Sequence, residues 1–266
     1  DKILQNIWEA KPPGGTMRKT TGDDRDPEEP MTQKILTEVR DLTKSYQMGE
    51  VTVHALRGVD LTLYEEELVV VLGPSGSGKS TLLNIIGGMD TPTSGSIRYR
   101  DMDLSSAGRD RLTRFRRNEV GFIFQFYNLM PNLTALENVQ LAARLSENPL
   151  PVDTLLEQVG LGERKDHFPA QLSGGEQQRV AIARGLSKNP SMLLCDEPTG
   201  ALDLQTGIGI LSLLRDFCRS YRKTVVLITH NSSIGEMADR VIYLKDGLID
   251  RIRVNENPVA PEKVSW

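Results

Sequence analysis

A glycine-rich segment in the first third of the chain constrains the fold more than any other feature. Residues 73–80 read Gly-Pro-Ser-Gly-Ser-Gly-Lys-Ser, follow the apolar run 68–72 and precede the helical stretch 81–86. A buried strand, a glycine-rich turn and a helix in this order are typical of a phosphate-binding loop, in which backbone N–H groups and the helix N-terminus surround a phosphate. Lys79 is expected to reach the phosphates, and the Ser80 hydroxyl to bind Mg²⁺. The expected phosphate-binding residues are Gly73, Pro74, Ser75, Gly76, Ser77, Gly78, Lys79, Ser80 and Thr81.

Other apolar segments predict the sheet that carries this loop. Residues 192–195 and 225–229 are continuous apolar runs, as expected for parallel strands that are buried on both faces. Helical stretches separate these runs, which is typical of an α/β fold. Alternating or hairpin-like strand patterns occupy residues 35–42, 59–63, 241–244 and 248–253.

The remaining segments divide the chain. Residues 1–30 contain four of the fourteen prolines and few apolar residues, so we expect a disordered arm, with a partner-docking arm as the alternative. Residues 31–254 are expected to form the structured domain. Within it, about residues 126–172 lack a strong strand pattern and are expected to form a helical subdomain. Residues 255–266 are expected to be an unpacked tail.

Composition argues against several classes of protein. The formal net charge is −4, so no global basic field draws the chain to nucleic acid. The longest aliphatic run, residues 68–72, is far below the ~18 residues of a membrane span. Two cysteines are too few for a disulfide framework. We therefore expect a cytosolic protein that binds no nucleic acid and meets a membrane only through a partner.

Acidic and imidazole side chains follow the two later apolar runs. Asp196 and Glu197 come directly after residues 192–195, at the sheet edge where ligands bind in such folds. Asp196 is expected to hold Mg²⁺ and Glu197 to activate water as a general base, with a solvated acidic turn as the alternative. His230 ends the run 225–229 and is expected to sense the terminal phosphate. A hydrogen-bonded histidine at a strand end is the alternative there.

A second anion site precedes a helical run that ends near Leu186. Residues 172–179 read Leu-Ser-Gly-Gly-Glu-Gln-Gln-Arg, and a serine hydroxyl with glycine N–H groups at a helix N-terminus favours phosphate. Because the chain already has one phosphate loop, the second most simply serves an ATP that another copy holds. With this segment the sequence resembles the ATP-binding cassette (ABC) ATPases, whose signature ends in Gln where this chain has Glu176. The resemblance covers about residues 35–253.

The resemblance implies a P-loop NTPase fold with a RecA-like parallel sheet core, an N-terminal antiparallel β subdomain and a helical signature subdomain. It implies that Tyr46 stacks on adenine, that Gln125 touches Mg²⁺ and the attacking water, and that Asp203 crosses a dimer interface. It further implies that two copies close head to tail on ATP and Mg²⁺. The signature residues expected to bind the nucleotide of the other copy are Ser173, Gly174, Gly175 and Glu176.

Finer resemblance indicates one branch of the family. Segments 84–95 and 124–139 resemble ATPases that pair with permeases of the lipoprotein-releasing, macrolide-exporter and cell-division type. This implies an ATPase on the cytoplasmic face of the cell membrane that powers a separate permease for export, lipoprotein release or transmission of force. The alternatives are the ATPase of an amino-acid-type importer and a soluble ABC protein that acts on DNA or ribosomes.

A basic run lies between the phosphate loop and the signature. Residues 109–117 carry five arginines and one aspartate. A solvated helix face is the expectation. Because a cassette of this family sits against the inner leaflet, contact with anionic headgroups or an acidic permease loop is the alternative.

Overall fold

The computed structural model describes residues 33–200 and 202–264. The chain divides into two units, Asp1–Lys34 and Ile35–Trp266, and every element named below belongs to the second unit. The expected arm at residues 1–30 lies outside the described residues, so that expectation stays a prediction.

A six-stranded sheet carries the phosphate loop. Its strand order is β10-β9-β3-β8-β7-β6, and every neighbouring pair except β10 and β9 is parallel. All residues of β3 and β8 are buried, which explains why β3 is apolar throughout and β8 is apolar between its two terminal threonines. The strands span Leu68–Leu72 (β3), Val120–Ile123 (β6), Met192–Asp196 (β7), Thr224–Thr229 (β8), Arg240–Lys245 (β9) and Leu248–Val254 (β10).

A second, antiparallel sheet has the order β2-β1-β4-β5. β1 and β2 form a hairpin that extends well beyond the patterns at residues 35–42 and 59–63, out to a pair between Met48 and Val51. The outer part of this hairpin is exposed on both faces, so burial imposes no pattern on it. The strands span Ile35–Met48 (β1), Val51–Tyr64 (β2), Ser94–Tyr99 (β4) and Met102–Asp103 (β5).

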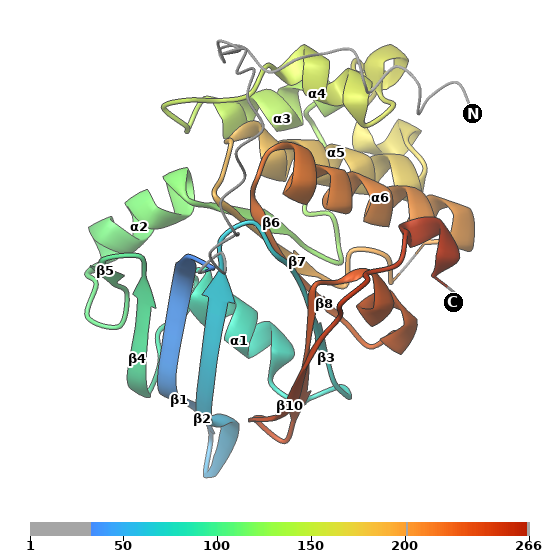
Figure 1. Cartoon of the computed structure of the whole chain (residues 1–266). Helices are drawn as coiled ribbons and strands as arrows, with labels where there is room; N and C mark the ends of the chain where they lie inside the picture. Colours follow the sequence, from blue (N-terminus) through green and yellow to red (C-terminus); the bar gives the residue numbers. More distant parts are fainter. Residues whose placement is uncertain (1–32, 201, 265–266) are drawn as a thin grey trace, which may run out of the picture. The chain divides into compact units, whose positions relative to one another are not determined.

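Helix α1 lies between the two sheets (Figure 1). Its four buried side chains share one apolar cluster with the antiparallel sheet and with Val69 and Val71 of β3. The other three residues of β3 belong to a second cluster with α5 and α6 on the opposite face. The helices span Lys79–Ile86 (α1), Arg109–Asn118 (α2), Ala135–Ala143 (α3), Val152–Gln158 (α4), Gly174–Ser187 (α5) and Leu204–Ser220 (α6). Short 3₁₀ helices span Gly162–Arg164 (η2), Pro169–Gln171 (η3), Ser232–Met237 (η4) and Pro261–Lys263 (η5).

Helices α3 and α4 pack on α5 through a third apolar cluster. Val139 of α3, Leu156 of α4 and Val180 of α5 are all buried in it. Residues 126–172, all of which are described, consist of helices and loops without a strand. Across the described part of the chain, no helix is both long and apolar enough to cross a membrane.

Helix α2 carries the basic run. Its Phe115 is buried and packs edge-on against Tyr99, with ring centroids 4.9 Å apart. Arg116 does not belong to a solvated face, because its guanidinium donates a hydrogen bond to the carbonyl oxygen of Gly88 at 2.6 Å. The four arginines of the run that are exposed are Arg109, Arg111, Arg114 and Arg117.

The expectation of an unpacked C-terminal tail is wrong for residues 255–264. Pro261 and Val264 are buried, and Val264 belongs to the cluster that covers α6. Arg215 of α6 donates to the carbonyl oxygen of Val259 at 2.9 Å. The apolar residues of this segment follow neither a strand period nor a helix period, so no pattern in the sequence indicates their burial.

A buried ion pair joins the amino ends of β3 and β9. Arg240 donates to both carboxylate oxygens of Glu67 at 3.1 Å and to the carbonyl oxygen of Thr62 at 2.9 Å. Burial raises the pKa of Glu67, and the charge of Arg240 opposes this shift. The Glu67 carboxylate therefore depends on the charge of Arg240 to remain ionised inside the protein.

Replacing Arg240 with methionine is expected to lower the free energy of unfolding by about 3–5 kcal/mol, because it leaves the Glu67 carboxylate buried without its cation. Chemical unfolding of the purified protein measures the loss. The double variant Glu67→Gln/Arg240→Met is expected to lose less than Arg240→Met alone. Wild-type stability in Arg240→Met would show that the pair does not act in this way.

Candidate functional site

The glycine-rich loop joins the carboxyl end of β3 to α1. A Cβ on Gly73 would lie 2.1 Å from the carbonyl oxygen of Leu244, so a larger residue does not fit there. A Cβ on Gly78 would lie 2.4 Å from the carbonyl oxygen of Ala55, and the φ of Gly78 is 99°. α1 then begins without a side-chain cap and without an acidic residue in its first turn. Its N-terminal N–H groups and partial positive charge are left for an anion, so the loop fits a phosphate.

The Lys79 side chain lies across this loop. Its Nζ donates hydrogen bonds to the carbonyl oxygens of Gly73 at 2.8 Å and Pro74 at 2.9 Å. Burial lowers the pKa of Lys79, and two nearby carboxylates oppose this shift. The Ser77 hydroxyl is buried and has no hydrogen-bond partner among the described residues, whereas a Cβ on Gly76 would meet nothing within 4 Å. The loop therefore fixes the Lys79 ammonium through its carbonyl oxygens and leaves free space beside Gly76.

Asp196 ends β7 and lies beside Ser80 in the first turn of α1. Burial raises the pKa of Asp196, while a hydrogen bond with Ser80 and the charge of Lys79 lower it. The neighbouring Glu197 raises it further. Carboxylate and hydroxyl oxygens are ligands that Mg²⁺ prefers, so the pair of Asp196 and Ser80 fits the expected metal.

Glu197, Gln125 and His230 come from three strand ends and meet at one edge of the sheet. The φ of Glu197 is 47°, and its N–H donates to the carbonyl oxygen of Ile228 at 3.0 Å. One carboxylate oxygen of Glu197, Oε1, lies 3.0 Å from His230 Nδ1. The other, Oε2, is buried and unpartnered among the described residues. The Gln125 amide nitrogen would lie 3.8 Å from a Cβ on Gly200, whose N–H donates to the carbonyl oxygen of Glu197.

Tyr46 is held near the phosphate loop by its hydroxyl group. The hydroxyl donates to Asp90 Oδ2 at 2.7 Å, and Lys44 Nζ donates to Asp90 Oδ1 at 2.6 Å. The Lys44 ammonium also lies 4.9 Å from the centroid of the Tyr46 ring. Burial and the bond to Asp90 raise the pKa of Tyr46, and a hydrogen bond with Thr81 of α1 lowers it. The ring is therefore fixed beside the first turn of α1, and its residue remains 37% exposed.

The second predicted anion site forms the start of α5. The Ser173 hydroxyl accepts from Glu176 N, and the Glu176 carboxylate accepts from Ser173 N at 2.8 Å, which makes a capping box. These bonds hold the pKa of Glu176 below its usual value. The second carboxylate oxygen of Glu176 lies 3.5 Å from Arg164 Nε. The box leaves out the N–H groups of Gly174 and Gly175, which could bind an anion.

Asp203 is the N-cap of α6. Its Oδ1 accepts from Thr206 N at 3.1 Å, and its Oδ2 from Thr206 Oγ1 at 2.7 Å. Thr206 also contacts the signature, since a Cβ on Gly175 would lie 2.4 Å from Thr206 Cγ2. Asp203 therefore supports the start of α6 within one copy, and its contact across a dimer interface stays a prediction.

Sequence reasoning missed four residues that hold these groups in place: Lys44, Asp90, Arg184 and Thr206. The first two fix the Tyr46 ring, and Thr206 packs on the signature. Arg184 donates to the carbonyl oxygens of residues 127 and 128, just after Gln125. These contacts join segments that are distant in sequence, and no local pattern indicates them.

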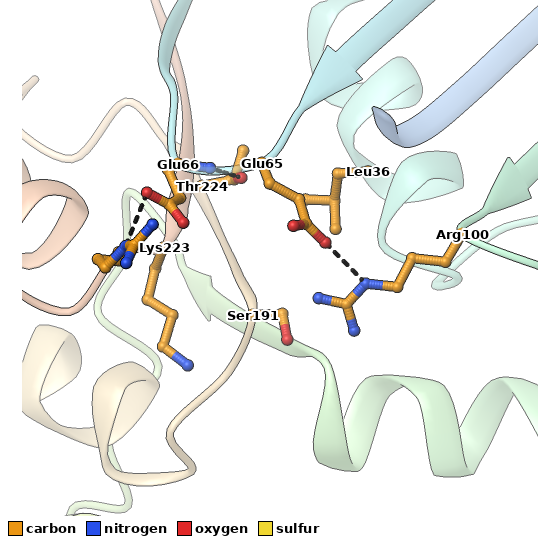
Figure 2. Close-up of a pocket in the computed structure, with 8 residues that line it drawn as sticks. Leu36, Glu65, Glu66, Arg100, Ser191, Lys223 and Thr224 are labelled. Carbon is orange, nitrogen blue, oxygen red and sulfur yellow. Dashed lines mark hydrogen bonds and ion pairs between the residues drawn. The ribbon is translucent and has the colours of Figure 1, made fainter. Parts of the chain in front are cut away.

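A small polar cavity lies at the opposite edge of the parallel sheet, near the amino ends of β3, β7 and β8 (Figure 2). Two ion pairs border it, between Arg100 and Glu65 at 3.1 Å and between Arg222 and Glu66 at 2.9 Å. The lining consists of Leu36, Glu65, Glu66, Arg100, Ser191, Arg222, Lys223 and Thr224. None of these described residues is a predicted site residue, so this cavity is separate from the phosphate loop.

The fold and the two phosphate cradles define the class of protein. The family model described as "ABC transporter" matches residues 56–200, which is more than half of the chain. The chain therefore belongs to the ABC transporter family. This confirms the resemblance found in the signature and its neighbouring segments.

Individual relatives confirm the branch. The chain is 44% identical to the lipoprotein-releasing system ATP-binding protein LolD of Shewanella frigidimarina, over 82% of this chain and 93% of that protein. It is 45% identical to the macrolide export ATP-binding/permease protein MacB of Marinobacter nauticus, over 82% of this chain and 34% of that protein. It is also 45% identical to a putative ABC transporter ATP-binding protein of Mycoplasma pneumoniae, over 88% of this chain and 51% of that protein. The chain thus spans about half or less of two of these relatives.

Among solved structures, the chain is similar to a dimeric post-hydrolysis state of the ATP-binding cassette MJ0796 bound to ADP and Pi. The TM-score is 0.78 at 42% identity, over 84% of this chain and 100% of that chain. MJ0796 is a protein of Methanocaldococcus jannaschii. This similarity confirms the expected α/β P-loop fold with its parallel and antiparallel sheets.

Proposed function

We propose that this chain is the ATPase subunit of an ABC transporter, which binds Mg-ATP between two head-to-tail copies and powers a membrane permease. One arrangement carries the proposal. The uncapped N-terminus of α1 lies beside the oxygen donors Asp196 and Ser80 and within the same site as Glu197, whose Oε2 is unpartnered among the described residues. An anion cradle, a pair of metal ligands and a free carboxylate oxygen are the parts that phosphoryl transfer to water requires.

The phosphate and metal roles follow from position. The N–H groups of residue 73 and residues 75–81 surround the phosphates, and Lys79 neutralises charge on the terminal ones. Ser80, Asp196 and Gln125 would hold Mg²⁺. When bound, the metal stabilises the charge that develops on the phosphate oxygens.

Glu197 is the general base of this proposal. Its Oε2 accepts the proton of the attacking water, and its buried carboxylate is held by the left-handed backbone and by His230. His230 donates from Nδ1 to Glu197 Oε1 and is largely exposed, so its other ring nitrogen, Nε2, can donate to the terminal phosphate when the ring carries both protons. The histidine ring thereby connects the terminal phosphate to the Glu197 carboxylate.

The second copy completes the site. Within one copy the phosphate-loop glycines Gly73 and Gly78 contact Leu244 and Ala55, whereas the signature glycines contact Tyr127 and Thr206. The two cradles therefore have separate surroundings, and each signature is available to the ATP of the partner. Similarity to a dimeric cassette supports this arrangement. The groups offered by the signature are Ser173, Gly174, Gly175 and Glu176, with Asp203 at the same interface.

The membrane partner is proposed to be a permease of the lipoprotein-releasing or macrolide-exporter type, because relatives with these names match most of the chain. The cassette then lies on the cytoplasmic face of the membrane. It spans residues 31–254, with residues 126–172 as its helical subdomain. A permease encoded with or beside this chain, with four membrane spans and a large extracytoplasmic domain, is the expected genomic finding; an importer-type permease there would contradict this part of the proposal.

ATP hydrolysis by the purified chain tests the core of the proposal. Phosphate release is expected to saturate with ATP concentration, to require Mg²⁺ and to stop when EDTA is added. Nucleotide binding, followed by equilibrium dialysis, gives the dissociation constant independently of turnover. A folded protein that neither binds nor hydrolyses Mg-ATP would contradict the proposed function.

Tyr46→Ala is expected to raise the Kd for ATP roughly tenfold, since stacking of a base on an aromatic ring contributes about 1–3 kcal/mol. Tyr46→Phe is the matched control, because it keeps the ring and loses only the hydroxyl group with its bonds to Asp90 and Thr81. The phenylalanine variant should therefore bind ATP nearly as well as the wild type. Equal, wild-type affinity in both variants would remove Tyr46 from the adenine site.

A further inference from the structure

Strand β6 leads to Gln125 and lies against helix α5 (Figure 1). A Cβ on Gly121 would lie 2.6 Å from the carbonyl oxygen of Gly185, so the two backbones approach closely. Lys188, just after α5, donates from Nζ to the carbonyl oxygens of Arg116 at 2.8 Å and Val120 at 2.6 Å. The start of β6 is therefore tied to the C-terminal end of α5.

Arg184, one helical turn earlier, ties down the chain that leaves β6. Its two terminal nitrogens donate to the carbonyl oxygens of Tyr127 at 2.8 Å and Asn128 at 2.5 Å. Both acceptor residues have left-handed backbones, with φ of 37° and 52°. Consecutive left-handed residues other than glycine are unfavourable unless the surroundings hold them. One half-buried guanidinium therefore fixes a strained turn that begins two residues after Gln125.

We propose that Arg184 is a positioning residue that sets the place of Gln125 relative to the signature. Helix α5 begins directly after Ser173, and the same helix holds the turn that follows Gln125. Tyr127 makes a second connection between this turn and the signature, because its hydroxyl would lie 3.0 Å from a Cβ on Gly174. Closure of the partner copy on the signature is therefore transmitted to Gln125. This inference rests on the proposed function, in which Gln125 acts at the metal and the water.

Two variants at the C-terminal end of α5 separate positioning from stability. Arg184→Met and Lys188→Met each replace a half-buried cation with an unbranched apolar side chain, and each removes two hydrogen bonds to backbone carbonyls. Only Arg184 acts on the side of β6 that carries Gln125. Arg184→Met is expected to lower kcat about 10- to 100-fold with an unchanged Kd for ATP, because the reacting groups are misplaced while the phosphate loop is intact. Lys188→Met should keep a kcat close to the wild type.

A measurement without nucleotide gives a second readout. Amide hydrogen exchange in residues 124–130 is expected to be faster in Arg184→Met and unchanged in Lys188→Met, since the strained turn is released only in the former. Arg184→Lys should restore part of kcat, because the ammonium still donates to a carbonyl oxygen. The recovery should be incomplete, because an ammonium cannot bind both carbonyls with the fixed geometry of a guanidinium. If the methionine variant does not fold, the lysine variant carries the same comparison.

The variant Gln125→Ala distinguishes failure of the inference about Arg184 from failure of the proposed role of Gln125. Adding Arg184→Met to it should lower kcat no further, as expected when one residue acts through the other. A low kcat in Gln125→Ala with wild-type kcat and exchange in Arg184→Met would overturn the inference alone. So would an equal loss of kcat in Lys188→Met. Wild-type kcat in Gln125→Ala would contradict the proposed role of Gln125 itself and remove the basis of the inference.

Discussion

Replacing Glu197 with glutamine is expected to lower the rate of ATP hydrolysis by about 10²–10⁴-fold and to leave nucleotide binding intact. Glutamine keeps the shape of the side chain and can still contact His230, but its amide cannot accept a proton from water. The phosphate loop and the metal ligands are unchanged. ATP should therefore bind, bring two copies together and remain uncleaved, so that the ATP-bound dimer accumulates.

Phosphate release and sedimentation velocity with Mg-ATP measure both parts of this prediction. Glu147→Gln makes the same chemical change at an exposed position between α3 and α4, and it should hydrolyse ATP like the wild type. Turnover by Glu197→Gln at a rate close to the wild type would remove Glu197 from the role of base. A slow variant that stays monomeric with Mg-ATP would instead contradict the link between ATP binding and dimerisation.

Lys79→Ala and Ser173→Arg are both expected to abolish most hydrolysis, but at different steps. Lys79→Ala deletes the cation held over the phosphate loop and should raise the Kd for ATP roughly 10- to 100-fold, because a hydrogen bond to a charged group contributes about 1.5–3 kcal/mol. Ser173→Arg leaves the phosphate loop of its own copy untouched. Its bulk blocks the ATP of the partner, so binding by the monomer should persist while dimerisation is lost.

Ser173→Ala controls for the helix cap, since it removes the hydroxyl that accepts from Glu176 N without adding bulk. It should dimerise better than Ser173→Arg. Calorimetric binding to the monomeric variants gives the Kd values. Loss of ATP binding by monomeric Ser173→Arg would show that the signature acts on the ATP of its own copy.

The phosphate loop and its sheet could be predicted because their signals are local. Residues 68–86 form a strand, a turn and a helix in uninterrupted order, and each part has its own sequence pattern. The meeting of Asp196, Glu197 and His230 also follows from sequence, since side chains at the carboxyl ends of adjacent parallel strands share one edge. The exact hydrogen bonds among these side chains do not follow from the sequence, because they depend on the left-handed backbone at Glu197.

Several elements could not be predicted. β6 has only four residues, and β4 begins with three exposed positions, so neither shows a clear period. The C-terminal segment packs through apolar residues that follow no strand or helix period, among them Pro261 and Val264. Burial of these residues is decided by the surface of α6 that they cover, which no local pattern records.

The residues that position the site are the least visible in sequence. An arginine at position 184 of an otherwise amphipathic helix is typical of a solvated face, yet its guanidinium is bound to two carbonyl groups 56 and 57 residues away. The same holds for Asp90, which lies between α1 and β4 and binds Lys44 and Tyr46 of β1. Such contacts arise only when distant segments pack together.

Mixing the Lys79→Ala and Ser173→Arg variants tests the central claim, a nucleotide site shared by two copies, most directly. Each variant alone has a defect in both sites of its homodimer. In a mixed dimer both defects fall in one site, and the other site combines an intact phosphate loop with an intact signature. An equal mixture should therefore recover up to about a quarter of the working sites of the wild type, as symmetric pairing requires. Hydrolysis by the mixture no greater than the sum of the two separate variants would contradict the shared site.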